Sequence, residues 1–150
     1  MGWKLKTFDE LTTEELYIIL KERVDIFVVE QNCAYPEIDG CDRDCYHLFL
    51  EEEGELLAYL RIVPAGIKYE EASLGRVIVK QKHRGRGYAK ELIGRALRFA
   101  HEELGARSVK IQAQHYLRDF YGAFGFQPLT EVYLEDGIPH LDMLLEYDQR

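Results

Sequence analysis

The segment that decides the fold is Val77-Ile78-Val79-Lys80-Gln81-Lys82-His83-Arg84-Gly85-Arg86-Gly87-Tyr88-Ala89-Lys90, in which an apolar strand runs into a glycine-containing loop that opens an amphipathic helix. The first amides of a helix lack hydrogen-bond partners and carry about half a positive charge. Gly85 and Gly87 have no side chains, so a phosphate can approach those amides closely. The basic side chains around them are Arg84, Arg86 and Lys90. The segment therefore predicts a site for a pyrophosphate.

Other readings of these glycines are weaker. Glycines also serve ordinary turns, so either glycine alone is poor evidence. No Lys-Ser or Lys-Thr follows them as in a P-loop, and the three-glycine dinucleotide pattern is absent. The net charge is −8, yet residues 76–98 carry eight basic groups and one acid, which leaves −15 for the remainder. This distribution favours one anionic ligand held locally and disfavours a nucleic-acid partner.

Length and composition indicate one domain over residues 1–150. The chain has 47% hydrophobic and 31% charged residues, which is typical of a globular protein. No apolar run approaches the roughly 20 residues of a membrane span, and the N-terminus lacks a signal-peptide pattern. We therefore expect a cytoplasmic protein that has no membrane partner.

The three cysteines, Cys33, Cys41 and Cys45, are an odd number without a secretory signal, which argues against a disulfide framework. Cys41 and Cys45 could join His47 in a metal site, but a fourth ligand at a convincing spacing is missing. We expect free thiols around a loop and no metal.

Hydrophobic periodicity predicts the element order β-α-β-β-β-α-β-α-β-β, a mixed sheet with helices packed against it. Helices are expected from Thr12 to about residue 28, where Thr12 and Glu15 form a capping box, over 87–104 and over 117–124. Strands are expected over 3–8, 46–52, 55–63, 73–80, 108–113, 127–134 and 139–146. The loop over 31–45 is long enough to suggest a functional role.

Two motifs carry a resemblance to a known family. Arg84-x-x-Gly87-x-Ala89 resembles the acetyl-coenzyme-A loop of the GCN5-related N-acetyltransferase (GNAT) superfamily, and residues 120–126, Phe-Tyr-Gly-Ala-Phe-Gly-Phe, resemble a later segment of that family. Residues 27–33, Asp39-Gly40, His47 and residues 131–140 resemble the ElaA-like acetyltransferases within it. The likeness spans nearly the whole chain.

The resemblance implies a single-domain α/β fold with a mixed, mostly antiparallel sheet, flanking helices and two splayed central strands. In this family the backbone of the strand before the loop pairs with the pantetheine arm, and the loop amides hold the pyrophosphate. Many members have an Asn early in the later segment where this chain has Gln114-His115, so that cofactor contact is open. The cofactor-binding residues implied are Val77, Ile78, Val79, Arg84, Gly85, Arg86, Gly87, Tyr88, Ala89, Lys90 and Gln114.

The activity implied is transfer of an acetyl group from acetyl-CoA to a primary amine by direct attack in a ternary complex. Tyr121 is the expected general acid, because an ordinary tyrosine is protonated at neutral pH and can donate to the leaving thiolate. The general base is less defined: Glu30 ranks first and His47 second, with His115 and His140 as further choices. Cys33 has no surroundings that would activate a thiolate acyl carrier.

The acceptor is expected to be a small-molecule or peptide amine, which the acidic remainder of the chain would attract. Asp39, Asp42 and Asp44 in the long loop could contribute to that attraction. Arg23 and Arg76 do not suit an amine pocket, so they are either salt-bridged or read a carboxylate of the acceptor. A homodimer through a sheet edge remains open. The rival class is a non-catalytic sensor that binds coenzyme A or a nucleotide on the same fold.

Overall fold

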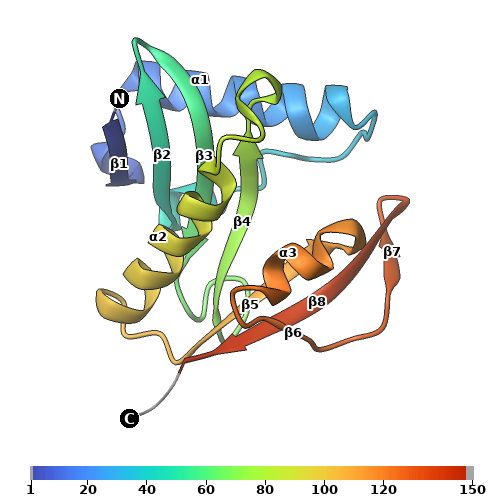
Figure 1. The fold of residues 1–150 in the computed structure, drawn as a ribbon. Coiled ribbons are helices and arrows are strands. Elements are labelled where there is room, and N and C mark those ends of the chain that lie inside the picture. The colour runs from blue at the N-terminus through green and yellow to red at the C-terminus, as the bar shows by residue number, and fades with distance from the viewer. Residues whose placement is uncertain (1, 148–150) are drawn as a thin grey trace.

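The computed structural model describes residues 2–147, which fold around one mixed eight-stranded sheet (Figure 1). The sheet order is β1-β2-β3-β4-β5-β8-β6, with β7 paired to β8, and the β4–β5 pair alone is parallel in the described chain. The strands are β1 (Gly2–Thr7), β2 (Tyr46–Glu52), β3 (Glu55–Val63), β4 (Ala72–Val79), β5 (Ser108–Gln114), β6 (Gln127–Pro128), β7 (Tyr133–Glu135) and β8 (Ile138–Glu146). The predicted fold class is confirmed.

Helix α1 (Thr13–Val24) begins at the predicted capping box. The backbone N–H of Glu15 donates to Thr12 Oγ1 at 3.0 Å, and the N–H of Thr12 donates to Glu15 Oε1 at 2.9 Å. The helix predicted to about residue 28 is an α-helix as far as Val24 and then continues as a π-helix over Asp25–Glu30. The wider π-helical turn lies where the chain reaches the cavity described below.

Helix α2 (Tyr88–Glu102) covers one face of β2, β3 and β4, and α1 covers the other face (Figure 1). The apolar stripe predicted from periodicity is the buried face of α2, formed by Leu92, Ile93, Ala96, Leu97 and Ala100. On the opposite face, Ile19 of α1 packs with Phe49, Tyr59 and Ile78. Burial of these two helix faces positions the loop between β4 and α2.

Strands β4 and β5 separate soon after they meet, as the resemblance implies. Their register contains Ala72 opposite Val109 and Ser73 opposite Lys110 and goes no further, although β4 continues to Val79 and β5 to Gln114. Figure 1 shows the two strands diverging. The backbone edges that face this opening are free of the hydrogen bonds that parallel neighbours would normally supply.

Strand β4 also carries a bulge at Arg76. Tyr59 of β3 pairs with Ile78, whereas Arg61, two residues further on, pairs with Gly75, so β4 holds one extra residue here. Arg76 takes a φ of 54°, which is uncommon for a residue with a side chain. Bulges of this kind bend a strand and redirect its side chains, often beside a functional site.

The C-terminal strands differ from the prediction. The expected strand over 127–134 is two short strands, β6 and β7. The ladder ends after Pro128 because the N–H of Asp142 donates to the side-chain oxygen of Thr130, at 3.1 Å, and not to a backbone carbonyl. The hairpin turn between β7 and β8 is confirmed: Asp136 and Gly137 have φ values of 51° and 78°. Helix α3 (Arg118–Gly122) is shorter than predicted and follows a 3-10 turn over His115–Leu117.

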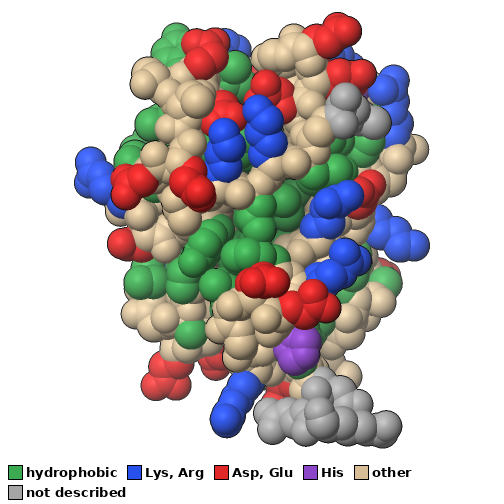
Figure 2. Space-filling view, turned by 90° about the vertical axis from the view of Figure 1, so that its left-hand side faces the viewer, with side chains coloured by type: hydrophobic (Ala, Val, Ile, Leu, Met, Phe, Trp, Pro, Cys, Tyr) green, Lys and Arg blue, Asp and Glu red, His purple; other side chains and the backbone are tan. Residues whose placement is uncertain are grey.

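The surface has mixed charge on the face shown in Figure 2, where hydrophobic side chains form a band and acidic and basic side chains lie beside it in mixed groups. Some of the apolar side chains in the described chain are well exposed, among them Tyr17 and Tyr116. Among the described residues, none of the helices combines the length and apolar character that crossing a membrane would need.

Replacing Leu92 by Ala should lower the free energy of unfolding by about 2–5 kcal/mol, because this fully buried leucine fills the space between α2 and the sheet. Urea denaturation measures the loss. The matched control is Tyr17→Ala on α1, whose side chain is 68% exposed and whose removal should cost less than about 0.5 kcal/mol. Equal losses in both variants would contradict the assigned core.

Candidate active site

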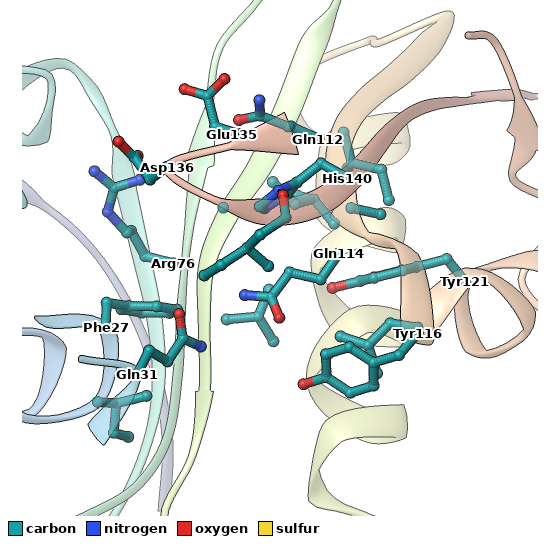
Figure 3. Close-up of a pocket in the computed structure, with 18 of the residues that line it drawn as sticks. Phe27, Gln31, Arg76, Gln112, Gln114, Tyr116, Tyr121, Glu135, Asp136 and His140 are labelled. Carbon is teal, nitrogen blue, oxygen red and sulfur yellow. The ribbon is translucent and has the colours of Figure 1, made fainter. Parts of the chain in front are cut away.

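A cavity of about 710 Å³ lies where β4 and β5 diverge (Figure 3). Its walls come from β4, β5, the π-helix after α1, helix α3 and the turn between β7 and β8. Residues far apart in the sequence therefore meet here, for example Phe27, Arg76, Tyr121 and His140. A concave site at a break in a sheet is a common place for a ligand.

The residues expected to bind the cofactor are divided between this cavity and its surroundings. Those that line it are Val77, Val79, Arg84, Ala89 and Gln114. The side chain of Ile78 is 1% exposed and packs in the α1 core, as strand alternation requires, so a ligand could meet it through its backbone alone.

Gly87 and Lys90 line a second groove of about 430 Å³ along α2, together with Arg95 and Arg98. Gly85, Arg86 and Tyr88 line neither space.

The glycine loop owes its shape to backbone conformation. Gly85 and Gly87 have φ values of 85° and 80°, in the left-handed region that favours glycine, and Gly87 is the N-cap of α2. A Cβ at Gly87 would meet no described atom within 4 Å, so packing does not demand glycine there. The left-handed conformation of the two glycines therefore shapes the loop that leads into the N-terminus of α2.

Arg84 ties this loop to two other elements. Its Nε donates to the carbonyl oxygen of Val79 at 2.8 Å, and its Nη2 lies 3.3 Å from Glu30 Oε2. Glu30 is the last residue of the π-helix, so the pair joins the end of the α1 segment to the glycine loop. Both side chains are more than 40% exposed, which makes this a weak, solvent-screened contact.

Tyr121 on α3 occupies the position expected of the general acid. Its side chain lies in the cavity wall with its hydroxyl pointing into the space (Figure 3). The residue is 6% exposed, and burial raises the pKa of its phenol to about 12, with Tyr116 contributing in the same direction. Phe120 and Phe126 hold the ring by edge-on contacts. Tyr121 is therefore protonated at neutral pH.

The sequence-predicted bases lie in different surroundings. Glu30 lines the cavity, but its carboxylate is engaged by Arg84. His47 lies outside the cavity and is 1% exposed, with Nδ1 2.7 Å from the hydroxyl of Tyr59 and Nε2 2.9 Å from the carbonyl oxygen of Asp42. Both of its nitrogens are occupied, and burial lowers its pKa, which suits a neutral structural imidazole.

The other two histidines also differ from each other. His115 is exposed and does not line the cavity. His140 on β8 lines it, with Nδ1 2.7 Å from the carbonyl oxygen of Ile138. Its ring is stacked on Tyr133, with centroids 6.4 Å apart. Sequence order alone cannot separate His140 from His115, because the difference depends on which face of its element each residue occupies.

Arg23 and Arg76 belong to a buried ionic cluster behind the cavity. Arg23 on α1 is fully buried and donates to Glu37 Oε2 at 2.8 Å and to Asp42 Oδ1 at 2.6 Å. Arg76 donates to the same Glu37 oxygen at 2.6 Å. Both arginines are therefore salt-bridged to the long loop, the first of the two roles considered for them.

Arg61 on β3 completes this cluster. It donates to both carboxylate oxygens of Asp39, at 2.9 and 2.6 Å, and to Asp42 Oδ1 at 3.1 Å. The hydrogen bond from Arg61 holds the pKa of Asp39 well below its usual range. Burial alone would lower the pKa of Arg61, but these carboxylates raise it, so both partners stay ionised. Asp39 and Asp42 are thus committed to arginines and are not free to attract an amine.

The cluster fixes the shape of the 31–45 loop. Glu37 also accepts from the hydroxyl of Tyr35 and, through its carbonyl oxygen, from Arg23 and Arg76 at 3.1 and 3.2 Å. Tyr35 then lies against Arg76, whose guanidinium is 5.7 Å from the ring centroid. The loop becomes a rigid wall that brings Cys33, Tyr35 and Asp39 to the cavity. The sequence does not show these ion pairs, because the paired residues lie far apart in the chain. Three arginines on elements with an apolar pattern nevertheless indicate that buried partners exist.

Other lining residues were not singled out from the sequence. Glu135 and Asp136 lie at the β7–β8 turn, and Gln112 lies on β5 (Figure 3). Lys68 lies in the segment between β3 and β4. The Cys33 thiol contacts the carbonyl oxygen of Asp136 at 3.7 Å, which joins the loop to this turn. In the described part of the chain, no group of three or more His, Cys, Asp or Glu side chains could hold a metal ion, and the cysteines are free.

Comparison with known proteins agrees with this geometry. Residues 10–147 match the model of the acetyltransferase (GNAT) domain. The Escherichia coli protein ElaA is 40% identical over 149 residues, 98% of this chain and 97% of its own, and a Schizosaccharomyces pombe UPF0039 protein is 40% identical over 143 residues, 94% of each.

Solved structures give the same result. The crystal structure of Escherichia coli ElaA aligns with a TM-score of 0.91 at 39% identity, covering 97% of this chain and all of that one. An acyl-CoA N-acyltransferase from Pseudomonas aeruginosa aligns with a TM-score of 0.90 at 41% identity, covering 96% and 98%. At 11% identity, an aminoglycoside 6′-N-acetyltransferase complexed with coenzyme A shares the fold alone, with a TM-score of 0.72.

Fold, cavity and matched sequence together define an acyltransferase of the acyl-CoA-dependent class. The chain belongs to the GNAT acetyltransferase family, and within it the chain is similar to ElaA over nearly its whole length.

Replacing Glu37 by Gln should lower the free energy of unfolding by about 3–5 kcal/mol, because it leaves buried arginine charge without its partner. Urea denaturation measures this loss. Asp25→Asn is the matched control, since the Lys21–Asp25 pair is exposed and its loss should cost about 0.5 kcal/mol or less. A Glu37→Gln variant as stable as the wild type would show that the cluster is not a structural anchor.

Proposed function

We propose that this protein transfers an acetyl group from acetyl-CoA to a primary amine by direct attack in a ternary complex. The observation that carries the proposal is a protonated Tyr121 whose hydroxyl points into the cavity where β4 and β5 diverge. The coarser acyl-CoA-dependent transfer follows from the family. The acetyl group, the amine acceptor and the residue roles are our proposal.

The cofactor would enter along the diverging strands. The backbone of Val77, Ile78 and Val79 faces the gap and would pair with the amides of the pantetheine arm. Gln114 on β5 lies across this gap and offers a side-chain amide. The backbone amides from Arg84 to Lys90 would hold the pyrophosphate, where charge-assisted hydrogen bonds contribute about 1.5–3 kcal/mol each. The basic groups in the groove along α2 would lie near the remaining phosphate.

The chemistry needs a proton donor and a proton acceptor. The amine nitrogen attacks the thioester carbonyl carbon, a carbon–nitrogen bond forms, and the carbon–sulfur bond breaks. The coenzyme thiolate takes its proton from the Tyr121 hydroxyl, and the attacking nitrogen gives a proton to a base. The bulge at Arg76 gives β4 one residue more than β3 pairs with, and in our proposal a backbone N–H of this bulge would bind the thioester oxygen.

The acceptor would reach the cavity beside the β7–β8 turn. Glu135 and Asp136 line this side, and no ion pair to either is found among the described residues, so their charge is available to a cationic amine. Asp39 is already paired with Arg61 and Arg76. A small molecule or the amine of a peptide fits this opening.

Replacing Gly87 by Glu should weaken acetyl-CoA binding by at least about 100-fold, the loss of one or two charge-assisted hydrogen bonds. The new side chain adds bulk and negative charge at the loop, and isothermal titration calorimetry measures the change. The matched control is Gly105→Glu, which introduces the same charge at another left-handed glycine, φ 66°, beyond the end of α2. Equal binding by wild type and Gly87→Glu would remove the loop as the pyrophosphate site.

Replacing Tyr121 by Phe should lower turnover by about 10²–10⁴-fold while acetyl-CoA binding is kept, because the thiolate would leave without a proton donor. Thiol release from acetyl-CoA is followed with a panel of a polyamine, an aminoglycoside, free amino acids and a short peptide. Tyr17→Phe, at an exposed site on α1, is the control. Undiminished turnover by Tyr121→Phe across the pH range would exclude Tyr121 as the acid. Tight binding without turnover by wild type would favour the sensor module.

A further inference from the structure

His140 has a side chain that the structure holds in one defined orientation within the cavity. Among the residues described, it is the single histidine in the cavity wall. It lies on β8, the central strand of the C-terminal part of the sheet, directly opposite Gln114 of β5 on one side and Tyr133 of β7 on the other. A residue between two strand neighbours has little freedom to move.

The hydrogen bond at Nδ1 decides which nitrogen can act as a base. Nδ1 lies 2.7 Å from the carbonyl oxygen of Ile138, and a carbonyl oxygen can only accept, so Nδ1 carries the proton. In the neutral ring, Nε2 then holds the free lone pair. No protein hydrogen bond to Nε2 is found among the described residues. We propose that His140 is the general base that takes the proton from the acceptor amine.

A second network holds the ring in place from behind. Tyr133 stacks on His140 with an interplanar angle of 24°, and the Tyr133 hydroxyl donates to Asp142 Oδ1. Gln112 Nε2 donates to the same hydroxyl at 3.0 Å. Tyr133 is therefore fixed at its far end by two partners, and it fixes the plane of His140. Tyr133 is a positioning residue, since it acts through His140.

The alternatives are less suitable on geometric grounds. Glu30 lies beside the proposed pyrophosphate loop, where it makes a weak, exposed contact with Arg84, and both nitrogens of His47 are occupied away from the cavity. The ionisable groups around His140 are Tyr133 and Glu135 on β7, Asp136 at the turn, Asp142 on its own strand, and Tyr121 and Arg76 across the cavity.

The assignment rests on the proposed acetyl transfer and completes its proton balance. The acceptor binds as an ammonium ion, and His140 Nε2 takes one of its protons, directly or through one water, so that the neutral nitrogen can bond to the thioester carbon. The carbon–sulfur bond then breaks, and Tyr121 protonates the thiolate. Tyr121 and His140 come from different elements and face the same cavity (Figure 3), so the acid and the base do not compete for one position. The nitrogen gives its remaining excess proton to solvent as the amide forms, and between turnovers solvent takes the proton from His140 and returns one to Tyr121.

The test is the pH dependence of His140→Gln, with acetyl-CoA and the amine of the panel above that gives the fastest thiol release. At pH 7 the loss in kcat/KM should be about 10²–10⁴-fold. The loss should shrink as the pH rises toward the pKa of the amine, because more amine is then deprotonated without help. A merely structural role would give a loss that is the same at every pH. Added imidazole should partly restore His140→Ala.

Three controls separate the outcomes. His101→Gln lies beyond the cavity and should match wild type. Tyr133→Phe keeps the ring but removes its two hydrogen bonds, so it should lower kcat by a smaller factor and leave acetyl-CoA binding unchanged. Calorimetry on His140→Gln should show wild-type acetyl-CoA affinity, which also reports that the variant is folded.

The outcomes distinguish the two proposals. If the wild type turns over and the pH profile of kcat/KM for His140→Gln runs parallel to that of the wild type, the base assignment is overturned and the acetyl transfer is kept. Acetyl-CoA binding by wild type without thiol release for any amine would overturn the transfer, and the base assignment with it. A loss that shrinks with rising pH, together with imidazole rescue, would establish His140.

Discussion

The arrangement of the site depends on the buried charge pairing between three arginines and the 31–45 loop. Arg23, Arg61 and Arg76 come from α1, β3 and β4, and they meet Glu37, Asp39 and Asp42 of that loop. Buried ion pairs gain little net stability, but removing one partner is costly. The main effect of the cluster is therefore to hold the 31–45 loop in one conformation, and its net contribution to stability is small. In that conformation the loop forms one wall of the cavity.

Much of the fold could be predicted because local signals agreed with the final packing. The Thr12–Glu15 capping box, the stripe of α2 and the Asp136-Gly137 turn each depend on neighbouring residues, and each is present. The errors lie where contacts between residues far apart in the sequence decide the local structure. The sequence does not indicate that α1 continues as a π-helix, and a side-chain hydrogen bond from Asp142 to Thr130 ends a strand that periodicity alone would continue.

The site could be predicted in part for the same reason. The glycine loop and Tyr121 belong to contiguous motifs, whereas the surroundings of a base depend on the faces and partners of distant elements. His47 and His140 both lie on strands, yet one is enclosed by Tyr59 and Asp42 and the other lines the cavity. The role of Arg76 likewise depends on Glu37, which lies 39 residues away in the chain.

The position of β8 between other strands of the sheet has a consequence for folding during translation. It comes after all the other described strands in sequence, yet β5, β6 and β7 all pair with it, and β5 is otherwise held to the sheet by two residue pairs with β4. While the chain emerges from the ribosome, β1 to β4 and α2 can pack together early, but one whole side of the cleft has no strand to form on until residue 146 is free. The cavity can therefore form only after β8 has been synthesised, because β8 pairs with β5, β6 and β7.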